Sequence, residues 1–281
     1  MDGLDCGYFD ISLSNDYNLE WECLDFKTYS YKNYIKEIIL NAFNQNFSDI
    51  QKANNELGQL FAEYSDDFIY GRYLDLISTH GQTIWHLDKV GTKQVGDPQK
   101  LHNLFKVPVV YNVRQKDISS GGNGAPLMPF LDWLIFKNYN KIIFTLNLGG
   151  IANISLITES GNRNEVKGFD VGPGMSLIDV VCKRFFDKTM DKDGLLSSKG
   201  KINKIILDDL MLDDFINSPP PKSTGKNEFG DVFLNNLLKK YSDVNCYDLL
   251  RTLCAFSAKS IALNLQKYIN FNTKKIYLII S

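Results

Sequence analysis

Apolar residues recur along the chain at two spacings, and the two spacings predict different elements. Where they return every three or four positions they share one face of a helix. This spacing predicts helices at residues 33–43, 55–71, 127–139, from 176 onward, and 247–269. Short apolar runs between polar turns predict strands at 73–86, 107–113, 141–158 and up to 170, with a loop at 114–126. Alternating helices and strands indicate an α/β fold.

Strands at the two ends of the chain lack the neighbours that such strands usually have. The opening, "MDGLDCGYFDISL", places an Asp-Gly turn before an apolar strand, which is typical of the second half of a hairpin. The last residues, "KKIYLIIS", form a buried-type strand with no turn or helix after it. We therefore expect a chain that is incomplete at its N- and C-termini.

The length of 281 residues and a hydrophobic content of 44% allow two domains, each with its own core. A second hairpin is expected in "KIIFTLNLGGIANISLIT", around Gly149 and Gly150. This hairpin and the opening one would begin the two halves of the chain in the same way. We place the domains at residues 1–140 and 141–281.

The charge balance excludes several classes of partner. With 31 basic and 33 acidic residues the net charge is −2, so no general attraction to nucleic acid or an anionic membrane is expected. The five cysteines include no C-x-x-C pair, which argues against a disulfide framework or a zinc knuckle. No secretory signal is visible, so we expect reduced thiols and a cytoplasmic protein.

One acidic residue stands out in "GFDVGPGMSLID", residues 168–179. Asp170 ends a strand, and a glycine-rich turn leads from it into a helix. Ser176 and Asp179 have the spacing of a capping box, and such a turn is expected to leave backbone N–H groups unpaired, which favours an anion. Because like charges repel, Asp170 is predicted to act as a base on a group held nearby.

Common nucleotide-binding motifs are absent. The stretch "GLLSSKGKI" has the wrong glycine spacing for a P-loop, and "PKSTGK" lacks the first glycine. Neither "GGNGAPL" nor "GPGMSL" has the third glycine of a dinucleotide fingerprint. Several glycine turns spread over two halves remain, and their amides are another means of holding phosphate.

A series of motifs resembles the anhydro-N-acetylmuramic acid kinase family over almost the whole chain. They are "MDGLD", "ELGQLFAEY", "HGQTIWH", "VGDPQ", "RQKDISSGGNGAPLMP", "LNLGGIANIS", "GFDVGPGMSLID", "DKDG" and "PPKSTGKNEF", in the family's order. The resemblance implies a two-lobed actin/hexokinase-like (ASKHA) fold with an interlobe cleft, and a homodimer. It also implies ATP and Mg²⁺ as cofactors, and the conversion of anhydro-N-acetylmuramic acid to N-acetylmuramic acid 6-phosphate in peptidoglycan recycling.

The resemblance also implies roles for particular residues. Asp170 would be the general base that activates water. Asp2 would be a water-mediated magnesium ligand as well as part of the ATP site. The residues implied to hold ATP are Asp2, Gly3, Asn147, Gly149, Gly150, Gly172 and Gly174, and those implied to hold the sugar are His80, Gly81, Gln82, Thr83, Arg114 and Asp117.

The sequence departs from the family pattern in several places. Val171 and Met175 replace the usual Thr and Asn, and Asn112 stands where Asp is usual. The family's first phosphate hairpin strand and its adenosine loop are also missing. We therefore expect weak or no turnover of ATP, and an alternative is a catalytically impaired remnant that only binds the amino sugar. A different actin-fold phosphotransferase or chaperone ATPase is a third possibility, which the motifs disfavour.

Overall fold

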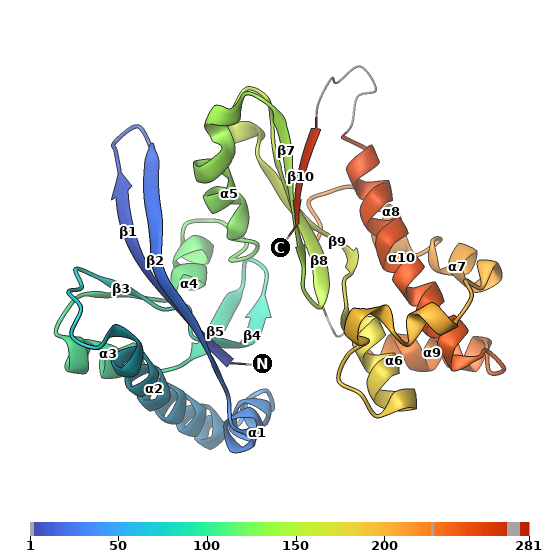
Figure 1. Cartoon of the computed structure of the whole chain (residues 1–281), viewed down its shortest axis with the longest axis horizontal. Helices are drawn as coiled ribbons and strands as arrows, with labels where there is room; N and C mark the ends of the chain where they lie inside the picture. The colour runs from blue at the N-terminus through green and yellow to red at the C-terminus, as the bar shows by residue number, and fades with distance from the viewer. Residues whose placement is uncertain (1–2, 226–227, 269–275, 281) are drawn as a thin grey trace. The chain divides into compact units, whose positions relative to one another are not determined.

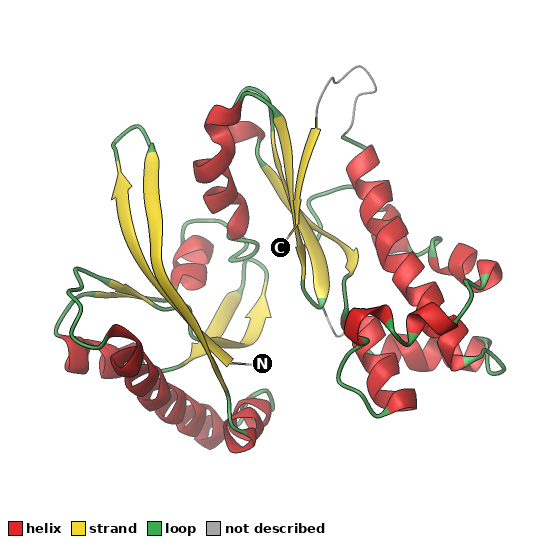
Figure 2. Ribbon diagram, in the orientation of Figure 1, coloured by secondary structure: helices red, strands yellow, loops and turns green. Residues whose placement is uncertain are grey.

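The computed structural model describes residues 3–225, 228–268 and 276–280 and contains two units, Met1–Leu127 and Met128–Ser281 (Figure 1). Each unit mixes helices with strands, so the α/β class is confirmed (Figure 2). The division falls before helix α5 (Met128–Phe136), whereas the sequence analysis placed it after this segment. The reason is packing, because α5 lies against strands of the second unit.

The first unit is built mainly from hairpins and two packed helices. Its elements are β1 (Gly3–Leu13), β2 (Leu19–Ser30), α1 (Asn33–Ala42), α2 (Phe47–Ile69), β3 (Ile77–Ser78), β4 (Gln82–Leu87), β5 (Gly91–Val95), α3 (Pro98–Phe105), β6 (Val109–Val110) and α4 (Val113–Ser119). The pairs β1–β2 and β4–β5 are antiparallel, and β3–β6 is parallel.

The opening strand forms a different hairpin from the predicted one. β1 pairs with β2, which follows it, in a register that runs from Gly3 opposite Ser30 to Leu13 opposite Leu19. The opening strand is therefore the first half of a hairpin within the described chain. Its distal end carries exposed apolar side chains on one face, where Ile11 lies opposite Trp21.

Apolar faces of α1 and α2 form the core of the first unit. Ile35 and Ile39 of α1 pack with Leu57 and Phe61 of α2, all nearly inaccessible to solvent. α1 occurs where the apolar spacing predicted a helix, whereas α2 begins at Phe47, well before the predicted start at residue 55. The predicted loop at residues 114–126 instead begins inside α4, whose residues are all at least partly exposed and therefore show no apolar period.

The second unit contains a four-stranded sheet and a group of helices. Its elements are α5, β7 (Ile142–Leu148), β8 (Ile151–Ile157), β9 (Lys167–Pro173), α6 (Ser176–Phe186), α7 (Lys204–Leu210), α8 (Asp214–Asn217), α9 (Asp231–Lys240), α10 (Cys246–Gln266) and β10 (Ile276–Ile280), with short 3-10 turns at 137–139, 163–165, 192–194 and 197–199. The strand order is β10-β7-β8-β9, and the pair β10–β7 is parallel.

Each face of this sheet is covered by a different helix. Phe144, Ile154 and Phe169 are buried on the face that contacts Ile261 and Leu265 of α10. The opposite face is covered at one end by α5, where Trp133 packs on Ile143 and Ile157. The predicted 141–158 hairpin is confirmed as β7–β8.

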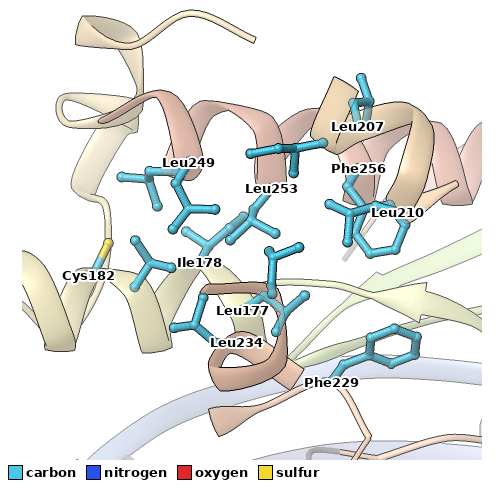
Figure 3. Close-up of a cluster of buried hydrophobic side chains, with 14 of the residues drawn as sticks. Leu177, Ile178, Cys182, Leu207, Leu210, Phe229, Leu234, Leu249, Leu253 and Phe256 are labelled. Atoms are coloured by element: carbon cyan, nitrogen blue, oxygen red, sulfur yellow. The ribbon is translucent and has the colours of Figure 1, made fainter. Parts of the chain in front are cut away.

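A second core joins the helices beside the sheet. Figure 3 shows side chains of α6 directed at those of α10, with α7 and α9 closing the cluster. Leu177, Leu249, Leu250 and Phe256 are each at most 1% exposed. Within the described residues, we find no helix with the length and apolarity needed to cross a bilayer.

Candidate active site

Asp170 lies in the middle of β9, next to Phe169, which is buried beneath α10. Adjacent strand residues point to opposite faces of a sheet, so the Asp170 side chain lies on the face away from α10. Asp170 is half-buried, whereas Phe169 is 1% exposed. The carboxyl group is therefore outside the hydrophobic interior and can take part in chemistry.

Two asparagines lie in the same row across the sheet as Asp170. Asn153 of β8 is opposite Asp170, and Asn147 of β7 is opposite Asn153. The next row contains Thr145 and Ser155, whose hydroxyls donate to the buried Asp132 of α5 at 2.7 and 2.5 Å. This end of the sheet is thus polar. Asn153 was missed by the sequence analysis, although a polar residue in an otherwise apolar strand was a usable signal.

A segment distant in sequence holds Asp170 in place. The Thr224 amide donates to Asp170 Oδ2 at 2.9 Å, and the Asp170 amide donates to the carbonyl of Lys222 at 3.1 Å. Residues 222–224 therefore lie beside β9 and fix both the backbone and the carboxylate. The motif "PPKSTGKNEF" contains these residues, but its spacing gives no indication of what they bind.

Lys222 is a second titratable group of this region. Its Nζ donates to the carbonyls of Phe215 and Ile216 at 2.8 and 3.2 Å, at the end of α8. Burial lowers the pKa of Lys222 to about 8, and the charge of Lys267 acts in the same direction. The ammonium group is therefore held by neutral oxygens in a partly dry setting.

The glycine turn after Asp170 is bonded to the tip of the β7–β8 hairpin. The amides of Gly174 and Ser176 donate to the carbonyl of Gly150 at 3.0 and 3.1 Å, and the Met175 amide donates to that of Gly149 at 2.9 Å. These N–H groups already have partners. The predicted anion seat of unpaired amides at this turn is therefore wrong for these three groups.

The predicted capping box is also wrong. Met175 occupies the N-cap of α6 and provides no side-chain cap. Ser176 is the first helical residue, and its hydroxyl donates to the buried carbonyl of Phe229 at 2.7 Å. The serine hydroxyl joins α6 to the segment before α9, and the Ser176 amide is bonded to the hairpin.

Packing explains why two positions in this turn are glycine. A Cβ at Gly174 would lie 2.2 Å from the Gly149 oxygen, and one at Gly172 would lie 2.8 Å from Ile216 Cδ1. Gly172 also has a φ of +144°, which disfavours other residues. A Cβ at Gly149 meets only ordinary contacts, the nearest at 3.6 Å, and both Gly149 and Asn147 are exposed. Binding of ATP by Asn147, Gly149, Gly150, Gly172 and Gly174 stays a prediction.

The first unit brings two predicted sugar-binding residues into direct contact. Arg114 Nε donates to His80 Nε2 at 2.7 Å, and Arg114 Nη1 donates to the carbonyl of Gly124 at 2.9 Å. His80 Nδ1 lies 2.8 Å from the oxygen of Gly81. Because an arginine nitrogen only donates, His80 Nε2 must accept and Nδ1 must carry the proton.

The environment of His80 favours the neutral ring. Enclosure by protein lowers the pKa of His80, and the charge of Arg114 lowers it further, against the effect of the Gly81 carbonyl. Burial also lowers the pKa of Arg114, without removing its charge at neutral pH. The pair is therefore a neutral histidine that orients a cationic guanidinium.

The other predicted sugar-binding residues have hydrogen bonds of their own. Asp117 Oδ2 accepts from the Gly124 amide at 2.8 Å, so Asp117 and Arg114 fix the same loop. Thr83 Oγ1 accepts from Gln94 Nε2 at 3.1 Å, and Gln82 Nε2 donates to the Thr83 carbonyl at 3.2 Å. A cavity of 260 Å³ adjoins the group and is lined by Asn54, Thr79, His80, Gly81, Thr92, Lys93, Gln94, Gly96, Pro98, Tyr111 and Asn112.

The predicted metal ligand lies outside the described residues, because Asp2 is among the residues that the structure leaves out. Gly3 begins β1, where a Cβ would lie 2.2 Å from the Tyr29 oxygen, so it too has a packing reason to be glycine. Over the described ranges no group of three or more His, Cys, Asp or Glu side chains could hold a metal ion.

Comparison with known proteins bears on the whole chain. A model of the family "Anhydro-N-acetylmuramic acid kinase" matches residues 1–279. The anhydro-N-acetylmuramic acid kinase of Clostridioides difficile strain 630 is 37% identical over 284 residues, which cover 96% of this chain and 74% of that protein.

Two further relatives carry the same name. The protein of Caldanaerobacter subterraneus subsp. tengcongensis is 34% identical over 88% of this chain and 68% of its own length. That of Bacillus cereus strain G9842 is 32% identical over 96% of this chain and 74% of its own length. The resemblance found in the motifs is confirmed, and the chain belongs to the anhydro-N-acetylmuramic acid kinase family of sugar kinases.

Proposed function

We propose that this chain uses ATP and water to convert 1,6-anhydro-N-acetylmuramic acid to N-acetylmuramic acid 6-phosphate in peptidoglycan recycling. Family membership over residues 1–279 supports the substrate and the kinase reaction. The single structural observation behind the proposal is a carboxylate, Asp170, that is kept out of the core and held by the Thr224 amide.

The reaction we propose joins hydrolysis to phosphoryl transfer. Asp170 takes a proton from water as the water oxygen bonds to the anomeric carbon. The bond from that carbon to the bridging oxygen breaks, and its electron pair stays on the oxygen. This oxygen then bonds to the γ-phosphorus of ATP, and the electron pair of the broken P–O bond leaves with ADP. The proton on Asp170 returns to solvent.

The surroundings of Asp170 suit a general base. An amide hydrogen bond to one carboxylate oxygen stabilises the ionised form and fixes its direction. Asn147 and Asn153 are in the same row of the sheet and can bind sugar or phosphate oxygens. A positioned base contributes roughly a hundred- to ten-thousandfold to a rate.

We propose that the β7–β8 tip, with Asn147, Gly149 and Gly150, contacts the phosphates of ATP. The exposure of Asn147 and Gly149 supports this role. Because the described residues offer no dedicated group of ligands, Mg²⁺ would be held mainly by ATP phosphates and water, as this ion commonly is, with Asp2 as the proposed outer ligand. When bound, the ion would neutralise charge on the phosphates.

The remaining family features are proposals of the same kind. They are the actin/hexokinase-like architecture, a homodimer and a cytoplasmic location. The charge of −2 agrees with a small-molecule kinase that has no electrostatic attraction to nucleic acid.

Phosphorus NMR of a mixture of the protein, the anhydro sugar, ATP and magnesium tests the proposal. We expect a sugar phosphate monoester and ADP in equal amounts, and neither when the sugar is omitted. Calorimetry without ATP should be run in parallel. Sugar binding without any monoester would overturn the kinase proposal and favour a protein that only binds the amino sugar.

A further inference from the structure

The Lys222 side chain anchors the segment that holds Asp170. The Thr224 amide donates to Asp170 Oδ2 at 2.9 Å, and the Asp170 amide donates to the carbonyl of Lys222 at 3.1 Å. In contrast, Lys222 Nζ donates to the carbonyls of Phe215 and Ile216 at 2.8 and 3.2 Å. The backbone of Lys222 is therefore bonded to β9, while its side chain is bonded to the end of α8.

The point to which Lys222 is attached is itself fixed. Ile216 is fully buried, and its carbonyl also accepts from Asn264 Nδ2 of α10 at 3.4 Å, since a carbonyl oxygen can accept two bonds. Asn264, which is also fully buried, donates to the carbonyl of Val171 at 3.3 Å. Val171 follows Asp170 in β9. The hydrogen bonds thus form a closed network from β9 through α10 and α8 to Lys222 and back to β9.

The surroundings of the Lys222 ammonium are those of an anchor. No ion pair recorded for the described ranges includes Lys222. Its Nζ lies 4.7 Å from the centre of the Phe215 ring, whose face favours a cation. Burial lowers the pKa of Lys222 to about 8, and the charged groups that act on it are Lys267, Asp213 and Asp170. An uncharged side chain would avoid the cost of burying a cation, but an apolar one could not bond the two carbonyls.

We propose that Lys222 is a positioning residue for the reaction: it ties residues 222–224 to the end of α8, keeps the Thr224 amide on Asp170, and so directs the carboxylate at water. The inference rests on the proposed function, in which Asp170 is the general base. Lys222 acts through Thr224 and need not touch a reactant.

Loss of this anchor should affect the rate more than the binding of sugar. The Thr224 hydroxyl donates to Glu228, so the segment has a second attachment beyond Thr224 and should stay beside β9. Without its tie to α8, the segment should hold Asp170 in more than one direction. A displacement of about 1 Å at a reacting group can cost about a hundredfold in rate.

Kinetics of the 281-residue protein with the anhydro sugar, ATP and magnesium test the role of Lys222. Lys222→Met should lower kcat about ten- to hundredfold, because the anchor bonds are lost. Affinity for the sugar, measured by calorimetry, should stay within about threefold. Lys222→Arg should lose less kcat than Lys222→Met, since a cation with several N–H donors is kept.

The matched control is Lys267→Met. Lys267 Nζ donates to the carbonyl of Asn217 at 3.4 Å, at the same end of α8, but Lys267 lies outside the segment that holds Asp170. Its removal should leave kcat within about twofold. An equal loss of kcat in Lys267→Met and Lys222→Met would overturn the proposal, because the end of α8 and not the segment would then be responsible.

Amide hydrogen exchange gives a measurement that does not depend on turnover. The amides of Asp170 and Thr224 make the two bonds between β9 and the segment. Their exchange should become about tenfold faster in Lys222→Met and stay unchanged in Lys267→Met. Exchange that is unchanged at both amides in Lys222→Met would overturn the anchor.

Failure of the proposed function gives a different pattern. If the unmodified protein shows no turnover, faster exchange in Lys222→Met alone would still support the anchor. Faster exchange with a kcat within about threefold of the unmodified protein would leave the activity and overturn the positioning role. Thermal unfolding identifies a variant that fails to fold. Lys222→Gln, which is uncharged and one bond shorter, then replaces Lys222→Met with the same expected results.

Discussion

The two candidate sites are held together by different kinds of bond. Around Asp170 most of the contacts are between backbone groups, and two glycines are required by packing. Around Arg114 the main contacts run from one side chain to another or from a side chain to a loop. Substitutions near Asp170 should therefore disturb the backbone of the turn, whereas those at Arg114 should disturb the loop at Gly124 and the orientation of His80.

The largest expected effect is on rate. Asp170→Asn should lower kcat by roughly a hundred- to ten-thousandfold, because an amide cannot accept the proton from water. Sugar affinity measured by calorimetry should change little. Asp243→Asn, at an exposed carboxylate, is the control and should keep full activity. A kcat within threefold of the unmodified protein would remove Asp170 from the mechanism.

The second largest effect is on stability, and it tests the packing of the Gly174 turn against the β7–β8 hairpin tip. Gly174→Ala should destabilise by about 1–3 kcal/mol, because its Cβ would lie 2.2 Å from the Gly149 oxygen. Gly149→Ala is the matched variant, since its Cβ has room. Urea unfolding should separate the two. If Gly149→Ala is fully stable but raises the KM for ATP, the hairpin tip contacts the nucleotide; equal stability of both variants would contradict the packing argument.

A smaller loss of stability is expected when one buried hydroxyl group is removed. Ser176→Ala leaves the carbonyl of Phe229 without the bond it accepts at 2.7 Å, which should cost about 1–2 kcal/mol. Ser198→Ala, at an exposed serine, should cost much less. Thermal unfolding of both variants provides the measurement. A loss that is equal in the two would show that the bond to Phe229 contributes nothing.

Lys222, beside Asp170, should make the stability of the folded chain depend on pH in the alkaline range. Its pKa is about 8 in the folded chain and near 10.5 when unfolded, so the unfolded chain binds more protons between these values. Stability from this group should therefore rise with pH from about 8 to 10.5. The free energy of unfolding of Lys222→Met, relative to the unmodified protein, should fall over that interval. A difference that does not change with pH would contradict the assignment.

His80, at the Arg114 site, should make the stability of the folded chain depend on pH in the acidic range. Its folded pKa lies below the ordinary value of 6.5, so stability from the neutral ring is present above 6.5 and is lost as pH falls through the folded pKa. Relative to His80→Gln, the unmodified protein should lose stability in this acidic interval. Urea unfolding at several pH values measures it, with His102→Gln as control. An equal pH dependence of the free energy of unfolding in the unmodified protein and in His80→Gln would exclude His80 as its source.

The elements with strong patterns were predictable from sequence, and the others depended on distant partners. The β7–β8 hairpin and α10 occur close to the predicted places, because their apolar periods match the faces they bury. β2 was missed because most of it is exposed and its sequence mixes charged with apolar residues. α4 was taken for a loop because it buries no residue.

The candidate site was predictable in part. The motif placed Asp170 at the end of a strand, whereas β9 continues past it to Pro173. The Thr224 amide and the bond from His80 to Arg114 join residues 54 and 34 positions apart, and no local pattern records such contacts. The glycines were expected to make room for a ligand, but Gly174 makes room for another part of the same chain.

The bonds between the hairpin tip and the first turn of α6 have a mechanical consequence. The amides of residues 174–176 donate to the carbonyls of Gly149 and Gly150, so hydrogen bonds hold the hairpin tip against the start of α6. Beyond these bonds, α6 packs in the same hydrophobic core as α10. We therefore expect that a ligand bound at the hairpin tip slows amide hydrogen exchange along α6, although α6 does not itself contact the ligand.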